Sequence, residues 1–159
     1  MKIKVLLDED FIQYKKPSMF IGTCYCDWKC CKDYGDITMC QNSELAEINI
    51  IIDISDYELI RRYLINDITE AVVFGGLEPM KQYEELYNFI KTFREYSDDD
   101  IVIYTGYTKE EIKDYVQELK KFKNLIIKFG RFIPNDIVRY DENLGVYLAS
   151  SNQYAEKIS

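Results

Sequence analysis

The sequence predicts an α/β protein built as an open, partial barrel of parallel strands. Short apolar runs alternate along the chain with amphipathic segments of roughly 10 to 15 residues, a pattern typical of βαβ units and a parallel sheet. The chain has 159 residues, whereas a closed eight-stranded barrel typically needs about 250. Because no internal repeat or low-complexity linker interrupts the pattern, we expect a single domain over residues 1–159.

The residue pattern in the first part of the chain predicts three extended segments and one helix. Residues 2–7 (KIKVLL) alternate polar and apolar side chains, residues 18–22 form a short apolar run, and residues 48–54 are rich in isoleucine. Ser55 and Glu58 form a capping box, which indicates that a helix begins there. The side chains that this helix is expected to bury are Leu59, Ile60, Tyr63 and Leu64.

The second part continues the alternation of strands and helices. Strands are predicted over residues 71–74, 101–104, 125–129 and 146–149. Helices are predicted over residues 83–96 and 108–122, the second with Thr108 and Glu111 as its capping pair. The buried face of the first of these helices consists of Leu86, Phe89, Ile90 and Phe93.

The charge and hydropathy of the chain argue against two kinds of partner. The formal net charge is −8, which disfavours direct binding to a nucleic-acid phosphate backbone. No apolar stretch approaches the roughly 20 residues needed to span a membrane. Residues 1–10 carry charges throughout and do not resemble a signal peptide. We therefore expect a cytoplasmic protein that binds neither nucleic acid nor membrane.

Five cysteines cluster between residues 24 and 40 in a chain without histidine. Thiolates are the soft ligands that select iron–sulfur clusters, zinc or Cu(I), so a metal bound here would be held mainly by sulfur. A disulfide framework and ordinary buried cysteines are the alternatives. The odd number of cysteines and a reducing compartment both weaken the disulfide interpretation. The five are Cys24, Cys26, Cys30, Cys31 and Cys40.

The other distinctive residues also follow predicted strands. The cysteine segment follows one strand, residues 75–79 (GGLEP) follow the next, and Thr105 and Gly130 follow two more. Ligands of open α/β sheets bind beyond the carboxyl ends of the strands. Paired glycines let a ligand approach the backbone, and Glu78 is a natural acceptor for a ligand ammonium group. The alternative for residues 75–79 is a tight turn that begins a helix.

With these residues in view, the chain resembles the radical S-adenosylmethionine superfamily. Within it, the chain is most similar to the small activating proteins of anaerobic ribonucleotide reductase. The resemblance extends from Met19 to about Lys157. The segments that carry it are CQNSEL (residues 40–45), FGGLEP (74–79), YTGYT (104–108), GRFI (130–133) and ASSNQ (149–153).

The resemblance implies three cluster ligands. The family motif is CxxxCxxC, and Cys26 and Cys30 have its first spacing, but residue 33, where the third cysteine would fall, is aspartate. The family's pattern after its last cysteine matches the residues after Cys40 instead, so the intervening loop is lengthened over residues 31–39. By resemblance, Cys26, Cys30 and Cys40 hold a [4Fe-4S] cluster with one open iron, with Cys24 and Cys31 as alternates.

The same resemblance implies a site for S-adenosylmethionine. Gly75, Gly76 and Glu78 match the motif that binds the methionine amino group, although Leu77 is inserted before the glutamate. Met39 holds the position of a residue that packs near the adenine, and Thr105 is expected to contact the cofactor. A helix beginning near residues 40–44 would favour an anionic cluster through its dipole.

The implied activity is reductive cleavage of S-adenosylmethionine to methionine and a 5′-deoxyadenosyl radical. By resemblance, the radical generates a glycyl radical on the large subunit of anaerobic ribonucleotide reductase, with flavodoxin or ferredoxin as the electron donor. Two alternatives stay open. One is a radical enzyme acting on another protein or a small substrate. The other is a non-enzymatic module whose fourth thiolate, from Cys24 or Cys31, closes a zinc or cluster site.

Overall fold

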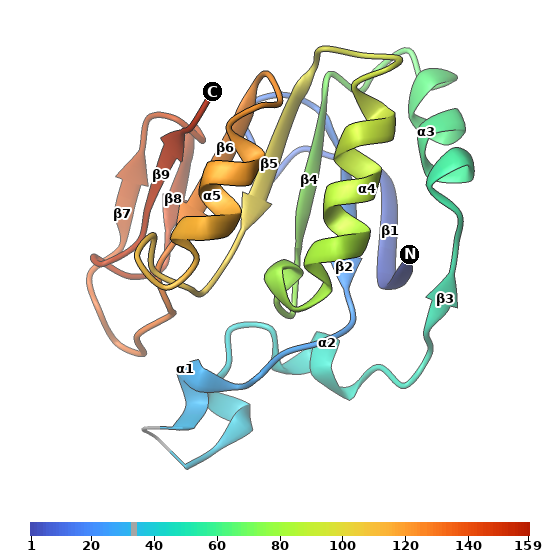
Figure 1. The fold of residues 1–159 in the computed structure, drawn as a ribbon. Helices are drawn as coiled ribbons and strands as arrows, with labels where there is room; N and C mark the ends of the chain where they lie inside the picture. Colours follow the sequence, from blue (N-terminus) through green and yellow to red (C-terminus); the bar gives the residue numbers. More distant parts are fainter. Residues whose placement is uncertain (33–34) are drawn as a thin grey trace.

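The computed structural model describes residues 1–32 and 35–159 and has a mixed α/β fold around a seven-stranded sheet (Figure 1). The strand order is β3-β1-β2-β4-β5-β6-β9. The four central strands are parallel, and the outer pairs β3–β1, β1–β2 and β6–β9 are antiparallel. The strands of the sheet are β1 (Lys2–Asp10), β2 (Ser18–Thr23), β3 (Ile52–Asp53), β4 (Ala71–Gly76), β5 (Asp100–Tyr104), β6 (Leu125–Phe129) and β9 (Tyr154–Lys157).

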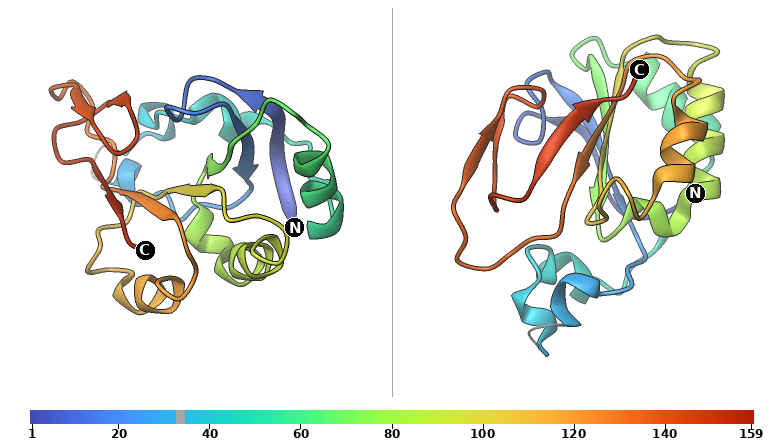
Figure 2. Two further views of the ribbon diagram at one scale, coloured as in Figure 1. Left: turned by 90° about the horizontal axis from the view of Figure 1, so that it is seen from above. Right: turned by 60° about the vertical axis from the view of Figure 1, so that its left-hand side comes forward.

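Helices cover one face of this sheet, as the right-hand view of Figure 2 shows. They are α3 (Asp56–Leu64), α4 (Tyr83–Phe93) and α5 (Lys113–Leu119). Their apolar stripes pack against every second residue of the strands, because strand side chains alternate between the two faces. This core contains Phe89 and Phe93 from α4 and Phe74 and Ile103 from the strands, all fully buried.

A two-stranded antiparallel sheet lies on the opposite face. It consists of β7 (Arg139–Asp141) and β8 (Val146–Leu148). Leu144 and Leu148 from this hairpin pack with Val73, Val102 and Ile126 of the main sheet in a second, smaller core. The main sheet is therefore covered by helices on one side and partly by a hairpin on the other.

The remaining short helices belong to the segment that joins β2 to β3 and to the turn after β4. They are α1 (Lys29–Lys32), η1 (Ile37–Met39), α2 (Ser43–Glu47) and η2 (Pro79–Gln82). The segment with α1, η1 and α2 lies beyond the carboxyl end of β2, below the sheet in Figure 1. The same edge carries the carboxyl ends of β4, β5 and β6, since these strands are parallel to β2.

Most predicted elements are present, but several boundaries were wrong. Residues 48–51 are not a strand, so the isoleucine-rich segment contributes β3 alone. Leu64 is 47% exposed because it lies at the last turn of α3. Helix α4 ends at Phe93, and α5 begins at Lys113 because residues 109–112 form a turn. The capping pair is nevertheless formed, with Thr108 and Glu111 each accepting from the other's backbone N–H.

The end of the chain differs most from the prediction. Strand β8 pairs with β7 rather than with the main sheet, and Tyr147 in its middle is 73% exposed. The strand that extends the main sheet is β9, which pairs antiparallel with β6. Residues 154–157 (YAEK) gave little signal because an edge strand of four residues buries few side chains. The open, partial barrel remains a prediction from the sequence.

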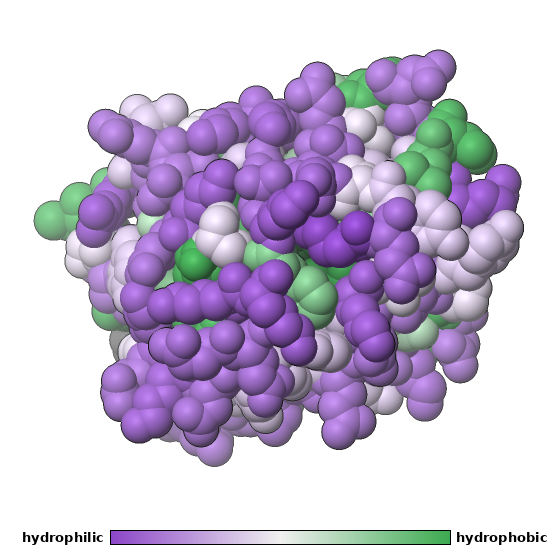
Figure 3. Space-filling view, turned by 45° about the horizontal axis from the view of Figure 1, so that its top comes forward, coloured by the Kyte–Doolittle hydropathy of each residue, from purple (hydrophilic) through white to green (hydrophobic). Residues whose placement is uncertain are grey.

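The surface agrees with the acidic, polar composition. The face drawn in Figure 3 is mostly hydrophilic, with hydrophobic side chains in small separate groups. Across residues 1–32 and 35–159, none of the helices has the length and apolar character that a membrane span requires.

Candidate metal centre and adjoining cavity

A cavity of about 330 Å³ lies where the cysteine segment meets the carboxyl ends of the central strands. Parallel strands end at the same edge of a sheet, so residues distant in sequence converge there. The expected convergence is confirmed for most of the residues singled out in the sequence. The lining includes Cys26, Cys30 and Cys40 from the cysteine segment, Gly75, Gly76 and Glu78 after β4, Thr105 after β5, and Lys128 and Gly130 at the end of β6.

The five cysteines separate into two groups by position. Cys26, Cys30 and Cys40 line the cavity. Cys24 and Cys31 are each 6% exposed and, within the described part of the chain, are not part of the lining. The cavity-lining cysteines therefore coincide with the three ligands that the resemblance implies.

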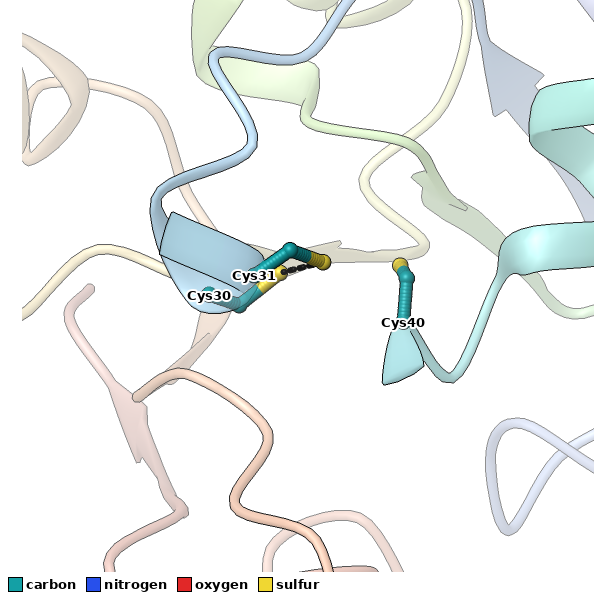
Figure 4. Close-up of side chains that lie close together, drawn as sticks. All are labelled: Cys30, Cys31 and Cys40. Atoms are coloured by element: carbon teal, nitrogen blue, oxygen red, sulfur yellow. Dashed lines mark hydrogen bonds between the residues drawn. The ribbon is translucent and has the colours of Figure 1, made fainter. Parts of the chain in front are cut away.

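The sulfur positions give a second, overlapping group. The Sγ atoms of Cys30, Cys31 and Cys40 all lie within 4.8 Å of one another. Figure 4 shows Cys40 pointing across toward Cys30 and Cys31, whose sulfurs are 3.5 Å apart. Cys30 and Cys40 thus belong to both groups, and the structure leaves Cys26 or Cys31 as the third ligand.

Local geometry explains how the first two cavity cysteines are placed. Trp28, between Cys26 and Cys30, has a φ of 57°, a left-handed conformation that is uncommon for a bulky residue. The backbone N–H of Trp28 donates to Cys26 Sγ at 3.3 Å. The chain then turns into α1, which carries Cys30 and Cys31. A strained backbone at this point is typical of ligand-binding loops.

The thiols differ in their acidity. A hydrogen bond from the Cys30 thiol lowers the pKa of Cys40 to about 6, and the same contact together with burial raises the pKa of Cys30. Burial also raises the pKa of Cys26 to about 11. Cysteine binds a metal as the thiolate, so metal binding here must release protons from the thiols of Cys26 and Cys30.

The cysteine segment is fastened to the sheet at several points. Asn42 Nδ2 donates to the carbonyl of Gly76 at 2.7 Å, and its backbone N–H donates to Cys40 Sγ at 3.4 Å. Lys4 on β1 donates to the carbonyls of residues 45 and 46 at the end of α2. The hydroxyl of Tyr107 donates to Asp27 at 2.5 Å. These contacts hold the cavity cysteines against the strand ends.

The two glycines after β4 serve different purposes. A Cβ on Gly75 would meet the Phe20 ring at 2.9 Å, and Gly75 lines the cavity. Gly76 has a φ of +90°, and a Cβ there would meet Thr23 N at 2.8 Å and the Cα of Gly22 at 2.9 Å. Packing against β2 therefore requires glycine at position 76, whether or not a ligand binds.

Glu78 is a buried carboxylate held by three donors. It is 4% exposed, and burial raises its pKa. Its Oε1 accepts from Met80 N at 3.1 Å and from the Thr105 hydroxyl at 2.7 Å, and its Oε2 accepts from Gly106 N at 2.8 Å. A carboxylate has about four lone-pair sites, so one remains for a ligand. The Gly-Leu-Glu-Pro turn and the ligand site are thus compatible.

One residue named from the sequence, Met39, is not at the cavity. Met39 is 36% exposed and, within the described chain, does not line the cavity. Asp33, at the motif's third position, lies outside the described residues. The short helix α2 begins at Ser43 with Asn42 as its N-cap residue, so Cys40 precedes it.

Sequence reasoning missed Asn42, Tyr107 and Lys128 as cavity residues. The position of Asn42, two residues after Cys40, was a usable signal because short polar side chains commonly fix turns. The sequence around Lys128 gave no signal of a cavity residue, since Lys128 resembles an exposed residue of an edge strand.

The donors present fit an iron–sulfur cluster. Three thiols from one segment line a cavity beside the sheet, and the chain contains no histidine that would favour another metal. The described cysteines are all free of disulfides. Cys30 and Cys40, together with Cys26 or Cys31, would hold such a cluster.

The sequence profile of one protein family, described as a 4Fe-4S single cluster domain, matches residues 15–154. The match runs from the residues before β2 to the first residue of β9, and so includes the cysteine segment and the cavity. No curated protein and no solved structure matches the chain.

Proposed function

Because the chain belongs to the family of 4Fe-4S single cluster domains, we propose that it is a radical S-adenosylmethionine enzyme. One observation carries this proposal: the cavity has three thiols on one side and the buried carboxylate of Glu78 on another. A closed cluster with four thiolate ligands needs no adjoining cavity and no buried carboxylate. An open iron that binds a zwitterionic cofactor accounts for both.

When bound, the cluster would supply the electron that cleaves the sulfonium of S-adenosylmethionine. The protein's own residues position the cofactor and exclude water. Glu78 accepts the ammonium group, and Thr105 and Gly106 hold the Glu78 carboxylate in place. Gly75 leaves the backbone open to the ligand on the cavity face.

The radical acceptor in this proposal is a glycyl-radical enzyme, the large subunit of anaerobic ribonucleotide reductase, in the cytoplasm. Flavodoxin or ferredoxin would provide the electron. This finer assignment comes from the resemblance of the residues after Cys40, after β4 and after β5, within an open, partial barrel. Another protein or a small molecule is the alternative acceptor.

The test is anaerobic reconstitution with iron and sulfide, followed by reduction in the presence of S-adenosylmethionine. The proposal expects a brown protein that forms 5′-deoxyadenosine. Glu78→Gln keeps the shape of the side chain and removes its charge, so it should weaken cofactor binding by about ten- to a hundredfold while keeping the iron content. A brown protein that neither binds nor cleaves S-adenosylmethionine would refute the proposal.

One observation favours a second function, a thiolate-only metal module. The sulfurs of Cys30, Cys31 and Cys40 lie within 4.8 Å of one another, and thiolates around a single zinc ion at about 2.3 Å stand roughly 4 Å apart. Cys31 would then be the fourth ligand beside Cys26, Cys30 and Cys40, with Cys24 as its alternate. A colourless protein that retains stoichiometric zinc after anaerobic purification, and takes up no iron, would support this function.

A further inference from the structure

A buried lysine lies in the same cavity, and the chemistry proposed above does not use it. Lys128 lies on β6 opposite Tyr104 of β5, on the face that carries the smaller core, and is 7% exposed. Its neighbour along that face of the strand is Ile126, which belongs to that core. Burying an ammonium group is costly unless it is paired or hydrogen-bonded, so its position calls for a ligand or a partner.

The protein provides Lys128 with little compensation. Its Nζ donates to the carbonyl of Gly130 at 2.8 Å, and an ammonium group can donate three hydrogen bonds. Three lysine and arginine side chains line the cavity in the described part of the chain. Lys29 and Arg131 both pair with Glu111, at 3.6 and 2.5 Å. Within residues 1–32 and 35–159, no ion pair within 4.0 Å includes Lys128.

Lys128 and Glu78 are therefore a buried cation and a buried anion in the same cavity that are not in contact with each other. Glu78 is held on its own side by Thr105 and Gly106. Lys128 is held by the carbonyl of Gly130. The backbone at Gly130 is closely packed, because its φ is +99° and a Cβ there would meet Asn152 O at 2.9 Å. A separated pair of buried opposite charges is complementary to a ligand that carries both charges.

We propose that Lys128 binds the carboxylate of an α-amino-acid moiety whose ammonium group binds Glu78. The inference rests on the proposed function, in which that moiety is the methionine part of S-adenosylmethionine. Lys128 would orient the amino acid in the cavity and offset the charge of the ligand carboxylate. It is chosen over Lys29 and Arg131 because those two are more exposed and are already paired with Glu111.

The poor solvation of the Lys128 ammonium group also supports the proposal. Burial lowers the pKa of Lys128 to about 8, whereas the charge of Glu78 acts to raise it. The cation is therefore poorly solvated before a ligand arrives. A carboxylate from the ligand would supply the acceptors that burial has removed.

The experiment removes each partner in turn. Binding of S-adenosylmethionine and of its decarboxylated analogue is measured by anaerobic calorimetry on the cluster-reconstituted wild type and on Lys128→Met. Lys128→Met should weaken S-adenosylmethionine binding by about tenfold or more and leave binding of the decarboxylated analogue nearly unchanged. Lys128→Gln, which retains a polar head, should behave in the same way. Lys157→Met, on the neighbouring strand β9, is the control for the loss of a lysine charge.

The outcomes separate this inference from the proposed function. If Lys128→Met and Lys128→Gln bind both ligands as the wild type does, or lose affinity for both by the same factor, the inference is wrong and the proposed function stands. If the reconstituted wild type binds neither ligand, both are overturned. Iron content measured on every variant shows whether the cluster is present.

Discussion

The hydroxyl of Thr105 donates a 2.7 Å hydrogen bond to Glu78 Oε1. It joins the end of β5 to the turn after β4, and both residues line the cavity. Both side chains are almost fully buried, at 1% and 4% exposure. Thr105 lines the cavity, where the resemblance implies a contact with the cofactor, and its hydroxyl also positions the carboxylate of Glu78.

Replacing Thr105 therefore tests how the Glu78 carboxylate is positioned. Thr105→Val removes the hydroxyl and should weaken S-adenosylmethionine binding by about three- to tenfold, because Glu78 loses one of its three donors. Thr105→Ser keeps the hydroxyl and should retain binding close to that of the wild type. The measurement is calorimetry on the reconstituted protein. Equal affinities for the valine and serine variants would show that this hydrogen bond does not position Glu78.

Single cysteine replacements decide the third ligand. Cys30→Ala and Cys40→Ala should both abolish cluster incorporation, since these residues belong to both candidate groups. Cys26→Ala should also abolish incorporation, and Cys31→Ala should be milder, because Cys26 lines the cavity and Cys31 does not do so in the described chain. Iron and sulfide analysis with the visible spectrum provides the readout. The reverse order for Cys26 and Cys31 would assign the ligand to Cys31.

Gly76 should be required for the stability of the fold even when no ligand is bound. Gly76→Ala should lower the free energy of unfolding of the metal-free protein by about 2 kcal/mol or more, because a left-handed residue with a Cβ costs roughly 1–2 kcal/mol before the contacts with β2 are counted. Urea denaturation checks this value. Gly35 has a φ of +68°, and among residues 1–32 and 35–159 an added Cβ there would have no neighbour within 4 Å. It is the matched control, and Gly35→Ala should cost less. Equal losses would show that the contact with β2 adds nothing.

Stability should depend on pH through Lys128. Its pKa is lowered from 10.5 to about 8 in the folded protein, so the folded state favours the neutral amine. Protonation of Lys128 therefore lowers the free energy of unfolding. This free energy is highest above pH 10.5 and falls by about 3 kcal/mol as the pH decreases to about 8. Lys128→Met lacks this dependence and should exceed the wild type in stability by more at pH 7.5 than at pH 10.5. Denaturant unfolding under reducing conditions at both pH values measures this, and a pH-independent difference would contradict it.

The sequence predicted the central part of the fold well because the parallel strands are short, apolar and bounded by glycine or by capping residues. Residues 71–74 and 125–129 are buried on both faces, which gives a strong signal. The hairpin β7–β8 and the edge strand β9 were missed because partly exposed strands mix polar and apolar residues. Pairing partners of such strands are set by tertiary contacts rather than by periodicity.

The sequence identified many residues of the candidate site, but it did not predict the contacts that these residues make. Cysteine spacing and the Gly-Gly-Leu-Glu segment identified two sides of the cavity. The distinction between Gly75 and Gly76 depends on which backbone lies behind each, and no local pattern contains that information. Lys128 was equally hidden, because a lysine on a strand usually faces solvent.

The placement of the cysteine segment has a consequence for how the protein matures. Neither of the two described hydrophobic cores includes a cysteine, and the segment is attached to the sheet through hydrogen bonds of Lys4, Asn42 and Tyr107. In small zinc-finger domains, metal binding and folding are a single event. Here, by contrast, we expect the polypeptide to fold around its two cores before iron binds, so that loading of the cluster is a separate, later step.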